Sequence, residues 1–542
     1  MSLLRFISRG SWRLVATAVV AGLVSGACSA ALIALINAVL SRGPLSARWL
    51  LGGFVVLTLA KIGSNALAQL ALNHFAQRTL AELCHDLSRR VLATPLRRLE
   101  ALGVPRILTG LIDDVAVIGW AIQNVPTLAI SLAGLVGCSM YLAWLSWRIF
   151  LVMIGTMVLG MLGSRVLSAR AHQYLQRARD AREALFRHFH ALTDGAKELK
   201  LHAGRRRAFL VEEVEPAIET LRHANLAGTG HYLVATSWTQ LLLYSLVGLL
   251  LFGLSVVEPL SLETLRGYVL ASFYVMSPMF TVIETWPIFA RGQVALQKVE
   301  ELRLALATGA GMALPTADPS PLGWERLELA GVRFAYADVG NNGFVLGPLD
   351  FTLRRGEIVF LVGGNGSGKS TFVKVLTGLY PPQAGLIRLD GHCISETNRA
   401  WLHSHFAVVF SDFYLFERLL GLAEADLDAR ARAYLVQLEL DDKVEVHRGA
   451  LSTTALSQGQ RKRLALLTAF LEDRPIYVFD EWAADQDPHY REIFYKRLLP
   501  ALTAHGKTIV VISHDDRYYH LGDRIVKLEY GELVEDTRLS SR

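Results

Sequence analysis

The feature that most constrains the fold is a series of long apolar segments in the first half of the sequence. Each is about 20 or more residues long, which is the length that a helix needs to cross the hydrocarbon core of a bilayer. Buried helices of a large soluble core rarely supply so many runs of that length. Six such segments lie near residues 14–40, 49–73, 123–146, 149–168, 233–256 and 266–290. The sequence therefore predicts six membrane-spanning helices.

Charged residues are sparse and mainly basic between these segments. Only 19% of the chain is charged, 52% is hydrophobic, and the net charge is +6. Lys and Arg gather on the cytoplasmic side of membrane proteins. Arginines precede the first segment and crowd the intervals 75–118 and 170–230, whereas Arg42, Arg48 and Arg148 are the few basic residues in the short loops on the other side. We therefore predict that both termini are cytoplasmic and that the two long intervals continue the membrane helices into the cytoplasm.

The pattern changes after residue 290. The stretch "QVALQKVEELRLALA" (293–307) predicts a helix that leaves the membrane, and "TGAGMALPTADPSP" after it consists of small residues and prolines, which are typical of a linker. From Trp324 onward, short apolar strands alternate with helical patterns, which indicates an α/β domain. We therefore assign residues 1–290 to a six-helix transmembrane domain with cytoplasmic helical extensions, 291–323 to a linker and 324–542 to an α/β domain.

A nucleotide-binding motif lies near the start of the α/β half. The apolar strand "EIVFLV" (357–362) leads into "GGNGSGKST" (363–371), and the helical pattern "FVKVLTGL" follows. Glycines let backbone N–H groups turn inward around phosphate oxygens, and the helix adds its positive N-terminal end. The pattern alone can be a chance glycine-rich turn, but the strand before it and the helix after it favour a P-loop that binds ATP. Its predicted nucleotide ligands are Gly363, Asn365, Gly366, Ser367, Gly368, Lys369, Ser370 and Thr371.

Two adjacent acids end a second apolar strand, in "PIYVFDEWAADQDP" (475–488). Carboxylates at the end of a buried strand are costly unless a cation or a reaction requires them. Beside a P-loop, Asp480 is predicted to hold Mg²⁺ together with the Ser370 hydroxyl, and Lys369 is predicted to reach the β and γ phosphates. Glu481 is predicted to polarise the water that attacks the γ-phosphate. A simple strand cap is the alternative, and the P-loop upstream argues against it.

Two further motifs follow the P-loop. In "LSQGQRKRLALLTAFL" (456–471), Ser457 opens a helix whose start is a second anion-binding end, although an ordinary N-cap is the commoner role for such a serine. In "TIVVISHDD" (508–516), His514 ends a strand. A neutral imidazole there can hydrogen-bond a γ-phosphate or its attacking water, although most lone histidines are not catalytic.

In this order, "GGNGSGKST", "LSQGQ", "VFDE" and "ISHD" resemble the ATP-binding cassette (ABC) family, and the whole chain resembles a half transporter of that family. The resemblance implies a type IV exporter-like six-helix membrane domain fused to an α/β P-loop ATPase domain. It implies a homodimer embedded in lipid of the bacterial inner membrane. "LSQGQ" matches the signature LSGGQ with Gln458 for a glycine, and implies that Ser457, Gln458 and Gly459 contact the nucleotide of the partner. Tyr336 in "VRFAYAD" matches the aromatic residue that stacks on adenine.

Two stretches depart from the pattern of that family. The glutamine of V-P-Q-D, which in the family touches Mg²⁺ and senses the transmembrane helices, is replaced by Ser411 in "VVFSDFYLF". Serine is shorter, so three alternatives stay open: water fills the gap, Asp412 contributes to the site, or the coupling between ATPase and membrane domains is looser. Where E-P-T-S-A-L-D is usual, "EWAADQD" keeps the acid Asp487 and has Ala484 for serine. "FSDF" and "DEWAADQDP" resemble the bacterial cyclic-peptide exporter branch, which includes exporters of syringomycin-type lipopeptides and pyoverdine-type siderophore precursors. The resemblance implies a peptide or siderophore-like substrate.

Polar side chains within the apolar segments face either a cavity or another helix, because lipid makes them costly. Contact between helices is the commoner role for a single serine or threonine. A cavity with aromatics, amides and a few charges would suit a large amphipathic peptide. The candidates are Lys61, Asn65, Gln69, Asn73, Trp238, Thr239, Gln240, Tyr244, Tyr268, Tyr274, Ser277, Glu284 and Trp286. The resemblance also implies short transverse helices near residues 95–102 and 193–199.

Other functions share part of this pattern. A lipid flippase or a multidrug exporter has the same fold, and an importer differs in direction. A nucleotide-gated regulatory membrane protein that does not hydrolyse ATP would suit Ser411, but the intact Lys369, Asp480, Glu481 and His514 argue for turnover. A soluble ABC protein acting on ribosomes or DNA conflicts with the six apolar segments. No basic stripe with interleaved aromatics is present, so we expect no nucleic-acid partner.

Overall fold

The computed structural model of the chain describes residues 12–42, 47–254, 261–307, 323–336, 343–422 and 426–539. It divides into two compact units. One unit, which we call the membrane unit, contains residues 1–85 and 110–300. The other, which we call the cassette unit, contains residues 86–109 and 301–542.

Six helical stretches are long and apolar enough to cross a bilayer, which confirms the predicted number. They run over Ala16–Leu40, Trp49–Ala93, Val104–Leu145, Trp147–Asp194, Ala203–Phe252 and Leu262–Leu306. Their helices, including three short π-helical turns labelled η, are α2 (Trp12–Arg42), α3 (Ala47–Ala93), α5 (Val104–Thr109), η2 (Gly110–Asp114), α6 (Val115–Gln123), α7 (Val125–Leu145), α8 (Trp147–Asp194), α10 (Ala203–Ala208), η3 (Phe209–Val214), α11 (Glu215–Gly248), η4 (Leu249–Leu254) and α13 (Leu262–Ala307).

Several of these helices continue far beyond their apolar segments. The apolar part of α3 ends near residue 73 and the helix reaches Ala93, while α8 is apolar to about residue 168 and reaches Asp194. The polar intervals are therefore helical, as predicted. Two short helices, α4 (Leu96–Leu102) and α9 (Ala196–Leu201), lie where the transverse helices were expected.

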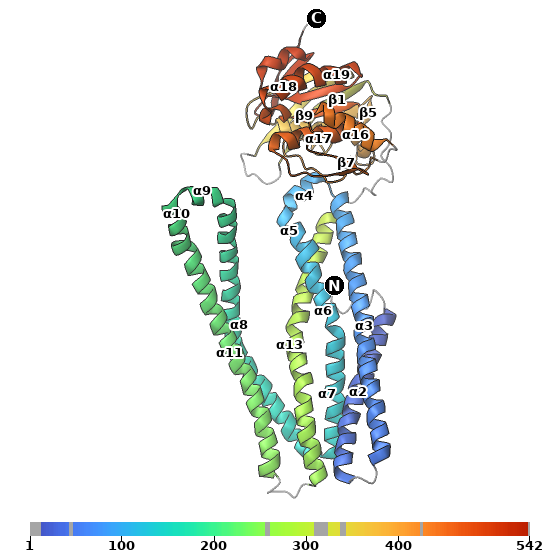
Figure 1. Ribbon diagram of the computed structural model, residues 1–542, viewed down its shortest axis with the longest axis vertical. Coiled ribbons are helices and arrows are strands. Elements are labelled where there is room, and N and C mark those ends of the chain that lie inside the picture. Colours follow the sequence, from blue (N-terminus) through green and yellow to red (C-terminus); the bar gives the residue numbers. More distant parts are fainter. Residues whose placement is uncertain are drawn as a thin grey trace. The chain divides into compact units, whose positions relative to one another are not determined.

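Close packing of small residues joins helices of the membrane unit. α2 lies beside α7, and α8 lies beside α11 as a long antiparallel pair (Figure 1). A Cβ atom on Gly26 of α2 would lie 2.4 Å from the Ala133 Cβ atom and 2.6 Å from the backbone nitrogen of Gly134, both on α7. Small residues that allow backbones to approach in this way are a principal means of association between membrane helices, since apolar burial adds little in lipid.

The cassette unit contains two larger sheets and one small hairpin. The order in the six-stranded sheet is β12-β11-β3-β10-β9-β6, and the order in the four-stranded sheet is β2-β1-β4-β5. In the six-stranded sheet, β6, β9, β10, β3 and β11 run parallel and β12 is antiparallel. The strands are β1 (Arg326–Ala335), β2 (Val345–Arg354), β3 (Ile358–Val362), β4 (Ala384–Leu389), β5 (His392–Cys393), β6 (Phe406–Val409), β7 (Val446–His447), β8 (Ala450–Leu451), β9 (Ile476–Asp480), β10 (Thr508–Ile512), β11 (Arg524–Glu529) and β12 (Glu532–Arg538).

The central strands β3, β9 and β10 are buried along their whole length, because helices cover the sheet. Their carboxyl ends meet at one edge, which is where ligands bind in open α/β sheets. The helices and short turns are α14 (Lys369–Leu376), α15 (Arg399–His403), α16 (Leu427–Gln437), α17 (Gln458–Glu472), η5 (Trp482–Asp485), α18 (Pro488–Ile493), η6 (Phe494–Leu498), α19 (Leu499–Ala504) and η7 (Asp516–Leu521).

Helix α4 packs within the cassette unit. Glu100 accepts hydrogen bonds from the Tyr380 hydroxyl and from Lys374 Nζ, the latter at 3.0 Å. The Arg97 guanidinium lies 5.0 Å from the centre of the Phe334 ring. These contacts join a short helix between two apolar segments to the sheet and to the helix after the P-loop.

The interval 291–323 was assigned to a linker whose residues 293–307 were predicted to be helical, and the structure confirms that helix. Helix α13 continues without a break to Ala307. Residues 308–322 lie outside the described residues, as do Arg5 and Arg9, two of the basic residues ahead of the first segment. The division of the chain at residues 290 and 324 stays a prediction.

Candidate functional site

The P-loop connects β3 to α14 at the shared edge of the parallel strands. Gly368 has φ +102°, and a Cβ atom there would lie 2.6 Å from the Phe344 ring, so this position requires glycine. Lys369 Nζ donates to the carbonyl oxygens of Gly363 and Gly364, both at 3.0 Å. Desolvation lowers the pKa of Lys369, while Glu481 and Asp480 oppose that shift. The loop therefore surrounds a cation whose position suits phosphate oxygens.

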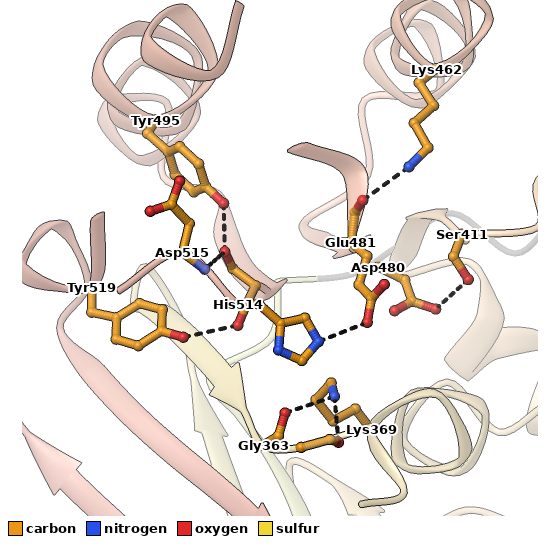
Figure 2. Close-up of polar contacts among 12 residues, drawn as sticks. Gly363, Lys369, Ser411, Lys462, Asp480, Glu481, Tyr495, His514, Asp515 and Tyr519 are labelled. Carbon is orange, nitrogen blue, oxygen red and sulfur yellow. Dashed lines mark hydrogen bonds and ion pairs between the residues drawn. The ribbon is translucent and has the colours of Figure 1, made fainter. Parts of the chain in front are cut away.

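Asp480 is the last residue of β9 and is only 2% exposed. One oxygen, Oδ2, accepts a hydrogen bond of 3.2 Å from Ser411 Oγ, and Oδ1 has no hydrogen-bond partner within the described chain (Figure 2). Burial raises the pKa of Asp480, the neighbouring Glu481 raises it further, and hydrogen bonds from Ser411 and Ser370 oppose the rise. A buried carboxylate with a free oxygen beside a serine hydroxyl is a suitable ligand set for Mg²⁺.

The described chain contains no group of three or more His, Cys, Asp or Glu side chains that would hold a metal by themselves. A Mg²⁺ ion at a P-loop can take one carboxylate and one hydroxyl from the protein and complete its shell with water and phosphate oxygens. Asp480 and Ser370 would supply those two ligand types, which stays a prediction. The ion, when bound, neutralises charge on the phosphate chain.

Glu481 and His514 meet beside Asp480. His514 Nε2 lies 3.1 Å from Glu481 Oε1, and both side chains are partly exposed (Figure 2). Glu481 has φ +50°, which is unusual for a residue with a side chain, and its backbone N–H donates to the Ile512 carbonyl oxygen at 3.2 Å. The carboxylate therefore ends at the rim of the sheet with an imidazole as its neighbour.

Two tyrosines hold the residue before His514. The Ser513 hydroxyl lies 2.8 Å from the Tyr495 hydroxyl, and the Tyr519 hydroxyl donates to the Ser513 carbonyl oxygen at 3.0 Å. These contacts fix the end of β10. Sequence reasoning missed both tyrosines, because nothing in the spacing of residues 495 and 519 indicates that they converge on one serine.

The signature segment begins α17 with a complete capping box. Ser457 Oγ accepts from the Gln460 backbone N–H at 3.4 Å, and Gln460 Oε1 accepts from the Ser457 backbone N–H at 3.1 Å. Ser457 is thus an ordinary N-cap in this structure. Gln458 and Gly459 lie beside the loop after β9, with the Gln458 amide 3.2 Å from Asp485 Oδ2. The contact of this segment with a nucleotide of a partner stays a prediction.

Tyr336 follows β1 and is 38% exposed. Its hydroxyl lies 3.1 Å from Thr371 Oγ1 in the P-loop helix, and its ring packs edge-on against Phe334, with ring centres 5.3 Å apart. The structure therefore places an exposed aromatic ring next to the P-loop, which is where an adenine would need a stacking partner. Asn365 and Gly366 are exposed in the same loop, and Ser367 is buried.

Some of the polar candidates predicted in the membrane unit are buried between helices, and others are exposed. Tyr268 is fully buried and its hydroxyl donates to the Leu142 and Ser146 carbonyl oxygens at 2.7 and 2.6 Å, so it connects helices. Lys61 lies 5.7 Å from the centre of the Tyr274 ring. Glu284 and Trp286 of α13 are exposed.

A small cavity lies between α8, α11 and α13, all within the membrane unit. Thr239, one of the predicted candidates, lines it together with Ser164 and Ser272. Five of the eight methionines of the chain share this lining, and they are Met153, Met157, Met161, Met276 and Met279. Sequence reasoning did not single out the methionines, because a methionine at helical spacing is usually ordinary packing.

Comparisons with known proteins agree with this arrangement. Residues 13–279 match the family described as "ABC transporter transmembrane region", and residues 346–484 match "ABC transporter". The chain is 36% identical over 538 residues to "ATP-binding protein SyrD" of Pseudomonas syringae pv. syringae, with 95% of this chain and 93% of that protein covered. It is 26% identical over 521 residues to an "ATP-dependent lipid A-core flippase" of Burkholderia orbicola, with 92% of this chain and 84% of that protein covered.

A solved structure shares the fold. It is described as "Structure of a bacterial Atm1-family ABC exporter with ATP bound", and it matches with a TM-score of 0.72 and 18% identity, covering 97% of this chain and 95% of that one. Six apolar helical stretches and a P-loop sheet therefore occur together here as they do in known exporters. The chain belongs to the ABC transporter family: it is an exporter-type half transporter, a multi-pass membrane protein that hydrolyses ATP with Mg²⁺.

Proposed function

We propose that this exporter moves a cyclic or non-ribosomal peptide, such as a peptide siderophore or lipopeptide, out across the bacterial inner membrane. The observation that carries the proposal is a pair of unusual segments, "FSDF" (410–413) and "DEWAADQDP" (480–488), which resemble the cyclic-peptide exporter branch. Lipid export has the weaker support from the comparisons, because the identity to the lipid A-core flippase is 26% against 36% for SyrD.

The methionine-lined cavity supports a large, partly apolar substrate. Methionine side chains are flexible and polarisable, and they adapt to ligands of irregular shape. The cavity itself holds only about 40 Å³, which is far smaller than a peptide. In this proposal, the cavity would have to widen, by separation of α8, α11 and α13, before a peptide or an acyl tail could enter it.

The chain acts as a homodimer in this proposal, with both termini in the cytoplasm. Ser457 and Gly459 of one copy contact the ATP that is held by Lys369 of the other. Two ATP molecules then favour the closed arrangement of the cassettes. Converting a two-state transporter almost completely requires about 5.5 kcal/mol of differential binding. Two charge-rich sites that close together are a plausible source of that free energy.

Hydrolysis resets the dimer. Glu481 takes a proton from the attacking water, whose oxygen bonds to the γ-phosphorus while the bond to the bridging oxygen breaks. His514, 3.1 Å from Glu481 Oε1, orients that carboxylate and is within reach of the water or a γ-phosphate oxygen. Lys369 stabilises the charge on the phosphates.

Transport into proteoliposomes tests the cargo. In inside-out vesicles, a fluorescent cyclic lipopeptide should accumulate with ATP and not with a non-hydrolysable analogue. Glu481→Gln is the matched control, because it retains the shape of the side chain and loses the base. Accumulation of the peptide that is independent of ATP would contradict the proposal.

Lipid export is the second candidate, because lipid A-core flippases match 92% of the chain. The same vesicles distinguish the two candidates when a labelled lipid A precursor replaces the peptide. ATP-dependent movement of the lipid, without movement of the peptide, would replace the peptide proposal by the lipid one.

A further inference from the structure

A buried lysine joins the signature segment to the loop after β9. Lys462 of α17 donates to the Glu481 carbonyl oxygen at 3.0 Å, as Figure 2 shows, and to Asp485 Oδ2 at 2.7 Å. Asp485 Oδ2 also accepts from Gln458 Nε2 at 3.2 Å. We call Gln458, Lys462 and Asp485 the clamp. It runs from the third residue of the signature, Gln458, to the backbone of the predicted catalytic glutamate.

Several of the residues that make these contacts depart from the usual exporter pattern. Compared with E-P-T-S-A-L-D, the loop has Trp482 for Pro, Asp485 for Ala and Gln486 for Leu. Trp482 Nε1 donates to the Lys462 carbonyl oxygen at 2.7 Å, and Gln486 Nε2 donates to the Gly459 carbonyl oxygen at 3.0 Å. Gln458 itself replaces a glycine of LSGGQ. The departures in two separate motifs therefore meet in one polar network.

Burial fixes the lysine end of the clamp, whereas Asp485 at the other end of the ion pair is 45% exposed. The Lys462 side chain is only 4% exposed, so its charge has few partners besides Asp485 and the Glu481 carbonyl oxygen. A buried cation without its acid is strongly destabilising, so the pair holds one geometry. Glu481 has φ +50°, and a conformation of this kind persists only where neighbours hold it. Lys462 is one of those neighbours.

We propose that the clamp residues are positioning residues for ATP hydrolysis, which transmit the position of the signature segment to Glu481. The signature start and the loop after β9 then move as one body. In the proposed homodimer, on which the following step rests, the signature contacts the ATP of the partner while Glu481 serves the ATP of its own chain. The clamp therefore couples the two ATP sites, so that ATP on one side helps to position the base on the other.

Steady-state ATP turnover of the full chain in nanodiscs, without cargo, tests the clamp. Asp485→Ala removes the shared acceptor, and Asp485 itself contacts no predicted P-loop ligand. We expect kcat to fall about tenfold while KM for ATP changes less than about twofold. The Hill coefficient for ATP should fall towards 1. The control is Asp442→Ala, which removes the exposed acid paired with Lys443 at 2.8 Å and should leave turnover unchanged.

Two more variants keep the result interpretable. Asp485→Asn retains an oxygen that accepts from both donors and should keep about half of native turnover or more. If Asp485→Ala does not fold, the double variant Lys462→Gln with Asp485→Ala removes the buried charge and leaves an amide that can donate to Glu481. We expect it to fold, to keep more turnover than a Glu481→Gln variant, and to lose the dependence on Gln458.

A double-mutant cycle between Gln458→Ala and Asp485→Ala separates the clamp from a direct contact of Gln458 with nucleotide. If Gln458 acts through Asp485, the double variant loses no more turnover than the worse single variant. Losses that multiply, or a native kcat and Hill coefficient in Asp485→Ala, would overturn the clamp. Cross-linking of the native chain shows whether it is a dimer, and so distinguishes failure of the clamp from failure of the proposed homodimer. A monomer that turns over ATP with a Hill coefficient of 1 overturns the coupling between sites.

Discussion

The edge of the six-stranded sheet and the interior of the membrane unit use buried polar groups for opposite purposes. At the sheet edge, Asp480 is 2% exposed and keeps Oδ1 without a partner in the described chain. In the membrane unit, Tyr268 is equally buried and its hydroxyl donates to two carbonyl oxygens, at 2.7 and 2.6 Å. A buried polar group that is satisfied joins structure together, whereas one that is left open at a strand end indicates a missing cation or substrate.

The largest effect is expected at Asp480, whose Oδ1 atom has no hydrogen-bond partner in the described chain. Asp480→Asn should lower ATP turnover about 100-fold or more, because a neutral amide is a poor ligand for Mg²⁺. The same variant should raise the melting temperature of the nucleotide-free protein. Burial raises the pKa of Asp480 above its ordinary value near 3.8, so the folded chain binds more protons than the unfolded chain above that pH, and the carboxyl costs stability as pH rises.

Thermal melting at pH 4 and pH 8 measures this effect, because the window of the shift begins near the ordinary pKa of the carboxyl. The gain in melting temperature of Asp480→Asn over the native protein should be greater at pH 8. Asp442→Asn, on the exposed surface, should change neither turnover nor melting. A variant at Asp480 that hydrolyses ATP at the native rate would show that the open carboxylate has no role in binding the cation.

The next largest effect is expected in the membrane unit, at the close contact between α2 and α7. Gly26→Ala should destabilise the protein by about 2 kcal/mol, because its Cβ atom would lie 2.4 Å from the Ala133 Cβ atom and α2 must move away from α7. Gly63→Ala on α3 is the control, since nothing lies within 4 Å of the new Cβ atom. Melting in detergent measures both. Equal melting temperatures would mean that α2 and α7 do not pack as described.

A smaller effect is expected at the proposed adenine contact. Tyr336→Ala should raise KM for ATP about tenfold, because stacking on an aromatic ring contributes on the order of 1 kcal/mol or somewhat more. Tyr336→Phe keeps the ring and loses only the contact with Thr371, so its KM should stay close to native. If both variants raise KM equally, the hydroxyl rather than the ring is responsible.

The smallest effect is expected at Tyr268, whose buried hydroxyl has hydrogen-bond partners. Tyr268→Phe should destabilise the protein by about 1 kcal/mol, because two carbonyl oxygens lose a donor, and should not change basal ATP turnover. Melting temperature and turnover on the same preparation test it. A loss of turnover with normal melting would give Tyr268 a role in transport instead of structure.

Local patterns predicted much of the fold. The apolar segments have a length that one helix satisfies, so the number of spanning helices was predictable from them. Strands β3, β9 and β10 were also predictable, because each is a short apolar run that ends at a nucleotide motif, whereas their order in the sheet was not predicted. The cytoplasmic end of the last spanning helix was predictable as well, because the helical pattern of residues 293–307 stops before Thr308 and Gly309 in the sequence, and α13 ends at Ala307.

Contacts between distant residues were not predictable. Glu100 meets Lys374 across 274 positions, and Lys462 of the helix after the signature meets Asp485 of the loop after β9. The contact that Ser411 makes in place of the usual glutamine was not predictable either. Its hydroxyl donates to Asp480 Oδ2 at 3.2 Å. Periodicity reports which face of an element is buried, but it does not report which other element covers that face.

ATP hydrolysis by the purified protein in nanodiscs, with and without candidate peptides and beside Glu481→Gln, tests the central claim most directly. The account predicts turnover that rises with a cyclic or lipopeptide substrate, does not rise with lipid A precursors, and is lost in Glu481→Gln while ATP still binds. Turnover that responds to lipid but not to any peptide, or that survives in Glu481→Gln, would contradict it.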